Sequence, residues 1–377
     1  VPVRKVAGTL RVPSASFFTS YATEGWLTAH GVCLLYGEVF MTDPQSWGMP
    51  DRFDPNDAKV IRRPESDESG YWVGAPGVFF DESTSNYYLS YRIRRPRGLA
   101  SDRGAEVHLA ASADGIEFET IWSCTKEEVG TASIERNAVR RLDNGQYALY
   151  LSFVDPADGR WRIDVCTADT IDGFDVTQRT KVFTAADLSV EGVDVEGVKD
   201  PALCRIAGQW QMIVSYATAV ESPSHDQLHG SLDAYNTGLI RSATGLAVSE
   251  DGLNWQWQGE LFGPSESGWD SYCARIGTVF RADGMWIGLY DGSASVEENY
   301  EERVGIAYSD DMRCFHRVTK SGPWMHTPHG AGALRYFDVL DFPERRLVFF
   351  EMALPNGSHD LRVFEVSKNR FMDERPF

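Results

Sequence analysis

The fold is decided by the stretch Val198-Lys199-Asp200-Pro201-Ala202-Leu203, which is followed by Gly208-Gln209-Trp210-Gln211-Met212-Ile213-Val214-Ser215-Tyr216. An acidic residue stands at the start of a short strand, and a turn leads to a second strand rich in aromatic and aliphatic residues. Related phrases recur at intervals of roughly 60 residues, and in each the same position opens a strand and carries a different polar residue. We therefore expect a repeated unit of short strands.

The repeat begins at Tyr71 and predicts five units of about four strands each, with Gly, Asp and Asn turns between alternating apolar runs. One small sheet per unit is typical of a radial propeller. The phrase Ser-x-Asp-Gly-x-x-aromatic, at 112–118 and 249–255, predicts a tight turn between a third and a fourth strand. The sequence therefore predicts an all-β fold, a five-bladed β-propeller with four-stranded antiparallel blades. The units are expected to open at Gly74, Ser133, Asp200, Tyr272 and Gly330.

A single propeller domain is expected over residues 1–377, with the five blades in 71–366. Residues 1–70 are expected to close the ring and to cover one face. Within this segment, 33–36 is expected to complete the last sheet, because pairing the first strand with the last removes an exposed edge. Residues 42–70 are rich in Pro, Asp and Arg and are predicted to be loop.

The formal net charge of −19 at pH 7 argues against nucleic acid and anionic membranes as partners, because their phosphate groups would be repelled. A neutral or cationic ligand suits such a field, although a local basic pocket can override it. No apolar run reaches the ~18 residues that a membrane-spanning helix needs. We expect a cytoplasmic protein, while the missing initiator Met leaves open a removed leader or tag. The oligomeric state stays undetermined.

The cysteines are widely spaced and form no CxxC pair, so zinc and thioredoxin-like sites find no support. Most of them lie in apolar runs, and we expect reduced thiols in the core. No metal and no cofactor are expected, with a structural or central-channel ion left open. The GxSxG, GxxxxGK[ST], HExxH and GxGxxG motifs are absent from the sequence, which argues against the chemistries that they carry. The cysteines are Cys33, Cys124, Cys166, Cys204, Cys273 and Cys314.

Three acidic residues, Glu135, Asp200 and Asp270, open consecutive units and are the predicted catalytic residues. In a propeller the first strand of each blade lines the central channel, so the leading side chains converge at one mouth. Carboxylates around one cavity suit glycosidic cleavage, in which one acts as acid and another as base. The alternative is that each acid is a solvated turn residue, and Glu196 competes with Asp200 for its position.

Three short phrases carry a family resemblance: Tyr71-Trp72-Val73-Gly74-Ala75-Pro76, Tyr87-Tyr88-Leu89-Ser90-Tyr91 and Lys199-Asp200-Pro201. They are similar to the Trp-Ala-Pro blade start, the Tyr-Tyr-Leu strand and the Asp-Pro strand opening of the five-bladed β-propeller glycoside hydrolases, which include arabinofuranosidases, xylosidases and fructosidases. The resemblance covers about residues 70–366.

That family uses an Asp base, an Asp that tunes and orients, and a Glu acid on separate blades. The resemblance thus implies Glu135 as general acid, Asp200 as tuning residue or base, and Asp270 as the remaining carboxylate. Here Glu135 precedes Asp200, which departs from the family order, and no clear Asp-Pro opens the first blade.

Further residues are predicted to bind substrate. Trp72 and Tyr272 suit stacking on a sugar ring, although core aromatics look the same in sequence. Arg136 and Arg275 would lower the pKa of an acid or bind a substrate carboxylate, and structural pairing with a neighbour is the alternative. The other predicted contacts are Arg92, Asp291 and Glu351 at second-strand ends, and His326 and His329 in a Pro- and Gly-rich loop.

The predicted function is a glycoside hydrolase that cleaves a carbohydrate by carboxylate acid–base catalysis in the central pocket. One alternative is a phosphate-dependent glycoside phosphorylase, in which Arg and His at the mouth would replace one carboxylate. The other is a non-catalytic propeller that binds carbohydrate or protein. The sequence does not decide the sugar, the linkage or the stereochemical outcome.

Overall fold

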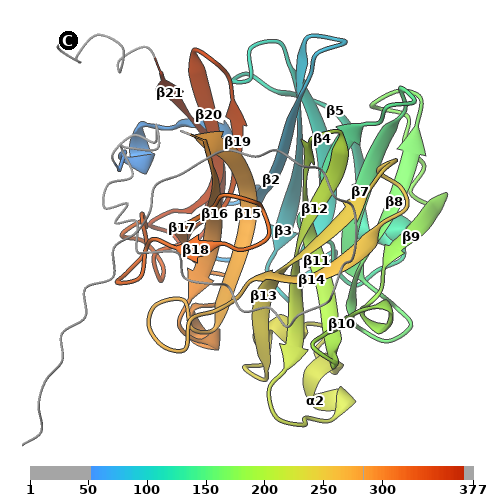
Figure 1. The fold of residues 1–377 in the computed structure, drawn as a ribbon, viewed down its shortest axis with the longest axis vertical. Helices are drawn as coiled ribbons and strands as arrows, with labels where there is room; N and C mark the ends of the chain where they lie inside the picture. The colour runs from blue at the N-terminus through green and yellow to red at the C-terminus, as the bar shows by residue number, and fades with distance from the viewer. Residues whose placement is uncertain (1–51, 283, 369–377) are drawn as a thin grey trace, which may run out of the picture. The chain divides into compact units, whose positions relative to one another are not determined.

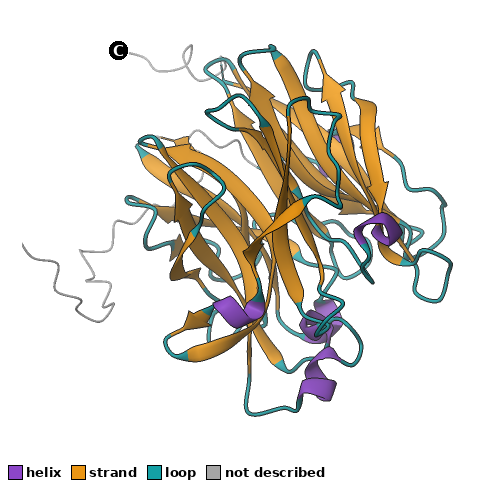
Figure 2. Ribbon diagram, turned by 90° about the vertical axis from the view of Figure 1, so that its right-hand side faces the viewer, coloured by secondary structure: helices purple, strands orange, loops and turns teal. Residues whose placement is uncertain are grey.

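The computed structural model describes residues 52–282 and 284–368, and all of them lie in the compact unit Phe40–Phe377. Strands dominate these residues, and the two α-helices, α1 (Lys126–Val129) and α2 (His225–His229), are short (Figure 2). The prediction of an all-β class is therefore confirmed. Across the same residues, no helix has the length and apolar character that crossing a membrane requires. Single 3-10 turns are η2 (Pro55–Asp57), η3 (Ala185–Asp187), η4 (Ala234–Asn236) and η5 (Val296–Glu298).

The described strands pair antiparallel in five sets, and each set follows the chain order (Figure 1). The first two sets are β2 (Trp72–Asp81), β3 (Asn86–Arg95), β4 (Arg103–Ser112) and β5 (Glu119–Thr125), then β6 (Ala138–Arg141), β7 (Tyr147–Val154), β8 (Trp161–Ala168) and β9 (Arg179–Phe183). The third is β11 (Val193–Ile206), β12 (Gln209–Ala219), β13 (Ile240–Ser249) and β14 (Gln256–Phe262), with β10 (Ser189–Val190) paired to the start of β11. The last two are β15 (Cys273–Ala282), β16 (Met285–Ser293), β17 (Arg303–Ser309) and β18 (His316–Arg317), then β19 (Leu334–Asp341), β20 (Arg345–Ala353) and β21 (His359–Ser367) with β1 (Lys59–Arg62).

The first strands of these sets contact one another in a closed cycle that runs β2, β6, β11, β15, β19 and back to β2. Single parallel pairs also join the third strand of one set to the first strand of the next, as in Ser242 with Cys273, Arg303 with Leu334 and His359 with Trp72. The first strands therefore surround a common centre, which is where side chains from distant parts of the chain can meet.

A β-bulge interrupts most of these first strands at an equivalent place. The register shifts between Gly74 and Gly77, Lys199 and Ala202, Ile276 and Thr278, and Arg335 and Asp338. Three non-glycine residues near the shifts have positive φ: Ala75 (53°), Asp200 (57°) and Tyr336 (53°). Such backbone costs roughly 1–3 kcal/mol per residue and concentrates where a side chain must be re-aimed. The bulges therefore mark the central region as the place to look for a site.

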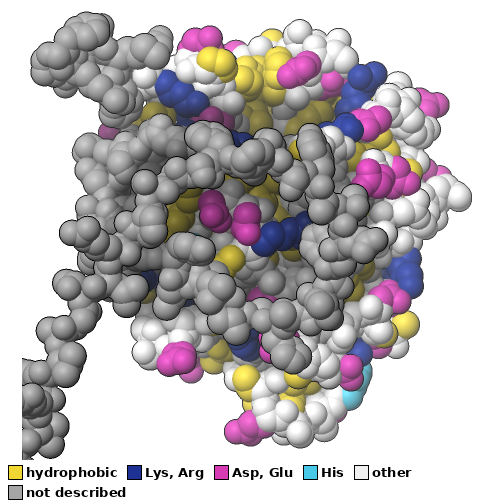
Figure 3. Space-filling model, viewed as in Figure 1, with side chains coloured by type: hydrophobic (Ala, Val, Ile, Leu, Met, Phe, Trp, Pro, Cys, Tyr) yellow, Lys and Arg dark blue, Asp and Glu magenta, His cyan; other side chains and the backbone are white. Residues whose placement is uncertain are grey.

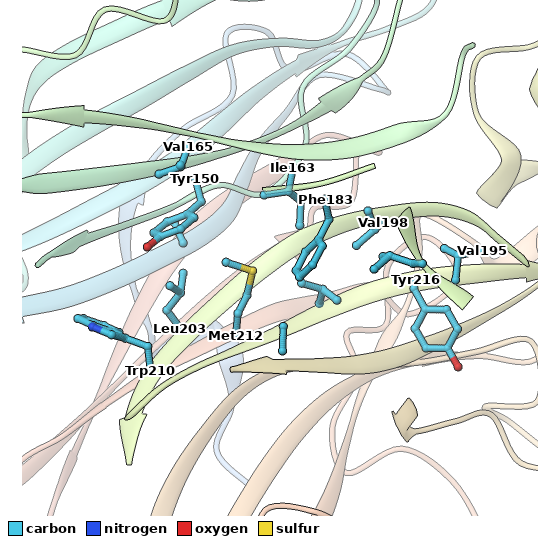
Figure 4. Packing of buried hydrophobic residues seen from close by; sticks show 14 of the residues in the cluster. Tyr150, Ile163, Val165, Phe183, Val195, Val198, Leu203, Trp210, Met212 and Tyr216 are labelled. Atoms are coloured by element: carbon cyan, nitrogen blue, oxygen red, sulfur yellow. The ribbon is translucent and has the colours of Figure 1, made fainter. Parts of the chain in front are cut away.

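Hydrophobic layers fill the space between neighbouring sets. In Figure 4, side chains from β7 and β8 point toward side chains from β11 and β12, and Tyr150 and Ile163 face Met212 and Leu203 across the layer. The predicted turn phrases lie where expected: Ser112 Oγ accepts the N–H groups of Asp114 and Gly115 between β4 and β5. The five described cysteines are free, and Cys124, Cys166 and Cys273 are buried as predicted.

The strand that completes the last set is β1, which pairs with β21 through Lys59 with Val363 and Val60 with Arg362. This corrects the prediction that residues 42–70 are loop. The strand is only four residues long and lies among Pro and Asp residues, so its alternation is too brief to stand out in sequence. Residues 33–36, which were expected to complete the last sheet, lie outside the described residues.

Candidate active site

Glu135 lies in the segment that leads into β6, and its side chain is 3% exposed. Its Oε2 is 3.3 Å from Nε of Arg92 and accepts a 3.3 Å hydrogen bond from the Tyr336 hydroxyl, and its Oε1 is 3.6 Å from Nη1 of Arg94. Burial raises the pKa of this carboxyl, but the positive charges of Arg92, Lys199 and Arg94 outweigh burial and hold the pKa below its usual value. Glu135 is therefore an ionised carboxylate at neutral pH.

Asp200 lies at the bulge of β11 and is also buried. Its Oδ1 accepts the backbone N–H of Arg136 at 3.2 Å, and its Oδ2 is 3.3 Å from Nζ of Lys199. The Lys199 ammonium lies over the rings of Trp161 and Tyr235 at 5.2 and 4.6 Å from their centroids. Among the described residues, no donor forms a hydrogen bond with Oδ2, so this oxygen is a buried acceptor that is available to a ligand.

Several contacts bring Glu135 and Asp200 into one cluster. The N–H that Asp200 accepts belongs to the residue that follows Glu135. The pKa of Tyr336 is held well above its usual value by burial and then by the charges of Asp200 and Glu135. The Tyr336 ring also lies 5.0 Å from the guanidinium of Arg335 and 5.9 Å from that of Arg92. The carboxylate just before β6 and the carboxylate on β11 thus share Tyr336 as a common neighbour.

Glu351 and Glu302 form a buried ion network around this pair. Glu351 is 3.2 Å from Nη2 of Arg92 and 2.7 Å from Nη2 of Arg335. Glu302 is 2.6 Å from Nη1 of Arg335 and also pairs with Arg275. Burial raises the pKa of both carboxyls, but the guanidinium charges outweigh it, so the pKa of Glu351 lies well below its usual value and that of Glu302 falls to about 2. Both carboxylates are charged and matched.

Asp291 accepts the backbone N–H of Tyr336 at 3.0 Å and thereby holds the bulge of the next first strand. Burial and the nearby charge of Glu302 raise the pKa of Asp291 to about 7. Glu351 does the same for the N–H of Ala75 at 3.1 Å. These second-strand carboxylates therefore shape the backbone on which the site is built.

The strand register explains why residues at second-strand ends reach the centre. Arg92 pairs across from Gly74, Asp291 across from Arg275, and Glu351 across from Arg335. Cross-strand neighbours of first-strand residues project near the same mouth. Arg92, Asp291, Glu351 and Arg275, all predicted as substrate contacts, are brought together here.

Gly74 leaves the space that the Glu351 carboxylate occupies. A Cβ at position 74 would lie 2.2 Å from Oε2 of Glu351. We expect Gly74→Ala to displace this carboxylate and to lower the free energy of unfolding by about 1–3 kcal/mol, as overpacking does. Urea unfolding measures the effect. Gly322→Ala, whose added Cβ meets nothing within 4 Å, is the control, and equal stability of the two variants would contradict this packing.

Asp270 is not brought to the cluster. It lies in the loop before β15, and its carboxylate accepts hydrogen bonds from Tyr290 at 2.9 Å, from Arg317 and from Ser265. The prediction placed the start of this strand too early in the sequence. Strand β15 begins at Cys273, so Arg275 takes the position that Glu135 holds before β6. The trio of carboxylates predicted from sequence is therefore a pair in the described geometry.

Arg136 occupies the centre of the cycle of first strands rather than the side that holds Glu135. Its guanidinium donates to the carbonyl oxygen of Pro76 at 2.8 Å and of Gly277 at 2.6 Å, and it lies 3.3 Å from Oδ2 of Asp338. These partners belong to β2, β15 and β19, while Arg136 precedes β6. The structural alternative, in which Arg136 pairs with neighbours, fits this residue.

The remaining predicted contacts take other partners. The indole of Trp72 stacks on His359 at 4.4 Å and donates to the Gly357 carbonyl, so it is held by protein groups beside the cluster. Tyr272 donates to the carbonyl oxygen of Tyr235 at 2.8 Å. His326 is exposed and its Nδ1 is 3.2 Å from the Thr327 carbonyl oxygen. His329 is half-buried in the same loop, and its N–H donates to the Thr327 hydroxyl.

The Nδ1 of His359 lies 2.7 Å from Oε1 of Glu351, so His359 belongs to the cluster as well. Six residues of the cluster were missed as site residues from sequence: Lys199, Tyr336, Arg335, Arg94, Glu302 and His359. The first three carried a signal, because the pairs 199–200 and 335–336 occupy the same positions at the bulges of their first strands. The others carried none, since they reach the centre from strand ends and loops whose register a sequence does not define. Glu196, the competitor of Asp200, instead pairs with Arg160 and His229.

The described surface is mixed in charge, and Figure 3 shows Asp and Glu side chains spread over its visible face with Lys and Arg among them. Within residues 52–282 and 284–368, no group of three or more His, Cys, Asp or Glu side chains is placed to hold a metal ion. Two surface hollows lie away from the cluster, one lined by 318–324 and Arg52, the other by 206–209 and 311–313 with Gln211 and Glu250. The buried ion cluster is therefore the candidate site.

Solved structures with the same fold are sugar-active propellers. A glycosyl hydrolase from Bacteroides ovatus is 14% identical with a TM-score of 0.54, and the match covers 88% of this chain and 96% of that one. A GH43_1 enzyme from Xanthomonas citri complexed with xylotriose is 14% identical with a TM-score of 0.51, covering 82% and 91%. A third structure is described as showing that the GH130 family of mannoside phosphorylases contains glycoside hydrolases that target β-1,2 mannosidic linkages; it is 14% identical with a TM-score of 0.53, covering 82% and 92%.

These similarities show that the chain shares the fold of GH43 and GH130 propeller structures. No protein-family model and no curated protein sequence matches the chain.

Proposed function

We propose that this chain is a glycoside hydrolase, a five-bladed β-propeller whose five antiparallel sets are four-stranded blades. One observation carries the proposal: Glu135, just before β6, and Asp200, on β11, are both buried, and Asp200 accepts the backbone N–H of the residue after Glu135, next to Tyr336. Paired carboxylates in one site are what glycosidic cleavage requires. The fold shared with GH43 and GH130 structures supports a carbohydrate substrate.

The electrostatics favour Glu135 as the charged partner, the reverse of the general-acid role that the family resemblance implied. An acid needs a raised pKa, whereas that of Glu135 is lowered. We assign Glu135 as base toward water or as nucleophile toward the anomeric carbon. Asp200, whose Oδ2 accepts no hydrogen bond from the described residues, is assigned as the acid that protonates the leaving oxygen. Product stereochemistry by NMR separates the two roles of Glu135.

The pH dependence of kcat/KM tests the assignment of Glu135. Because its pKa is lowered, the carboxylate stays ionised as pH falls, and the acidic limb of the profile is expected below the ordinary Glu value of about 4.3. Arg92→Gln removes the largest positive influence on Glu135 and should move this limb to higher pH. Arg95→Gln, three residues along β3 from Arg92 and paired with Glu65 and Glu106, is the control that should leave the limb in place. An acidic limb unmoved by Arg92→Gln would contradict the assignment.

A panel of aryl glycosides, assayed with and without inorganic phosphate, tests the proposed function. Hydrolysis that is independent of phosphate supports a hydrolase. Strict dependence on phosphate would instead favour the phosphorylase alternative, for which the basic groups of Arg94 and Lys199 near Glu135 provide an argument. Binding of glycosides without any turnover would favour the non-catalytic propeller.

A further inference from the structure

We propose that the substrate of this site carries a carboxylate, as a uronic acid residue does, and that Arg94 with Lys199 binds it. The inference rests on the proposed function, because it names the class of sugar that the same site would take. The basic groups that surround Glu135 and Asp200 carry it.

The guanidinium of Arg94 has N–H donors that no acceptor among the described residues uses. It comes from β3, its side chain is 8% exposed, and its charged contact is Glu135 at 3.6 Å. Its guanidinium lies over the rings of Tyr300 and Trp72, at 4.4 and 4.8 Å from their centroids. Within the described residues, Arg94 makes no side-chain hydrogen bond, although a guanidinium carries five N–H donors. A buried guanidinium that lies against two aromatic rings and keeps free donors is preorganised for a planar acceptor.

Lys199 and Arg92 add to this donor set. Lys199 also makes no side-chain hydrogen bond among the described residues. Its Nζ lies 3.3 Å from Oδ2 of Asp200, as an ion pair. Arg92 is 1% exposed, and its Nη1 is buried without an acceptor in the same part of the chain. An unpaired buried donor such as Nη1 of Arg92 is costly, so an anionic group that accepted from it would relieve the cost.

The charges of the cluster leave room for one more anion. Glu302 and Glu351 together face three guanidinium groups, those of Arg275, Arg335 and Arg92. Glu135 and Asp200 face the two remaining cations, Arg94 and Lys199. The fifth carboxyl, Asp291, has a pKa of about 7 and is thus only partly charged at neutral pH.

The five cations therefore exceed the three carboxylates with lowered pKa values, Glu135, Glu302 and Glu351, by two, and Asp200, the proposed acid, offsets at most one of them. This local excess reverses, at short range, the effect of the −19 net charge, which salt screens beyond about 8–10 Å.

A carboxylate fits these groups better than a neutral sugar hydroxyl. A guanidinium binds a carboxylate through two parallel N–H bonds, and charge-assisted bonds of this kind contribute more than neutral ones. Inorganic phosphate shares the oxyanion chemistry, so the experiment separates a carboxylate on the sugar from free phosphate.

The test pairs each aryl uronide with the neutral aryl glycoside of the same sugar configuration, with and without phosphate. We expect a uronide to exceed its neutral partner in kcat/KM by about 10–100-fold, the range that charge-assisted hydrogen bonds provide. Arg94→Gln should reduce this ratio toward one, and Arg94→Lys should retain part of it. Arg205→Gln, at the far end of β11 and paired with Asp143, is the control for loss of a surface guanidinium. Calorimetric titration with free uronic acids provides a readout that does not need turnover.

The outcomes distinguish the inference from the proposed function. Uronic acid binding that Arg94→Gln abolishes, without hydrolysis of any glycoside, would support the inference and overturn the hydrolase. Equal kcat/KM for uronides and neutral glycosides would overturn the inference and leave the hydrolase standing. If no uronic acid binds and no uronide is turned over preferentially, the inference is overturned. A phosphate KM that rises in Arg94→Gln, with no change in uronide preference, would assign Arg94 to phosphate and overturn it as well.

Discussion

Glu135→Gln is expected to lower kcat for an aryl glycoside by about 10²–10⁴-fold, the range that a positioned acid or base contributes. Gln has nearly the same shape as Glu, but it neither accepts a proton nor attacks as an anion at neutral pH. The loss should fall on kcat rather than on KM, because the amide still contacts neighbouring groups. Steady-state kinetics measures the effect, and circular dichroism verifies that the variant is folded.

Glu365→Gln is the matched control for Glu135→Gln. Glu365 lies on β21 with 46% of its side chain exposed and pairs with Arg345 at the surface. Exposed pairs of this kind contribute about 0–1 kcal/mol to stability, so neither folding nor turnover should change measurably. Turnover by Glu135→Gln equal to that of Glu365→Gln would remove Glu135 from the chemistry and would favour a different catalytic carboxylate.

Arg136→Met should cause the largest loss of stability among these variants, about 3–5 kcal/mol of the free energy of unfolding. The guanidinium satisfies two buried carbonyl oxygens, those of Pro76 and Gly277, and approaches Asp338, so three sets depend on one side chain. Met fills a similar volume but leaves Asp338 as an under-compensated buried charge. Urea unfolding at constant m-value gives the change in the midpoint.

Arg205→Met is the control for Arg136→Met, because Arg205 is 41% exposed and pairs with Asp143 at a turn. The surface variant should stay within about 0.5 kcal/mol of the parent. An Arg136→Met protein as stable as the control would mean that the central guanidinium does not tie the first strands together. Soluble expression of both variants is compared first, since a loss of this size removes much of the stability of an ordinary domain.

The strands were predictable because their apolar alternation is local, and the Ser-x-Asp-Gly turn is local as well. The turn motif is not recognisable where another residue replaces its glycine. A third turn of this kind, at Ser309–Asp311, has Met312 at φ 62° where the other two turns have Gly. Strand β1 was not predicted for a different reason: its four residues contain too little apolar alternation to identify a strand.

The candidate site was predictable only where side chains lie on a first strand or directly before it. Asp200 and Glu135 were found in this way, whereas Asp270 was misplaced because a shift of a few residues in the start of β15 puts Arg275 at the centre instead. Arg94 and Glu302 could not be found, since their approach depends on how separate sets are placed around a common centre. The roles of the carboxylates depend on neighbouring charges that come from other sets, and the lowered pKa of Glu135 is the example.

The most direct test of the central claim is a crystal structure of the Asp200→Asn variant soaked with the glycoside that the parent protein hydrolyses fastest. The account predicts that the glycosidic oxygen lies within hydrogen-bond distance of residue 200 and that the Glu135 carboxylate faces the anomeric carbon. A sugar bound in one of the surface hollows, such as that lined by 318–324, with Glu135 and residue 200 both out of contact, would contradict it.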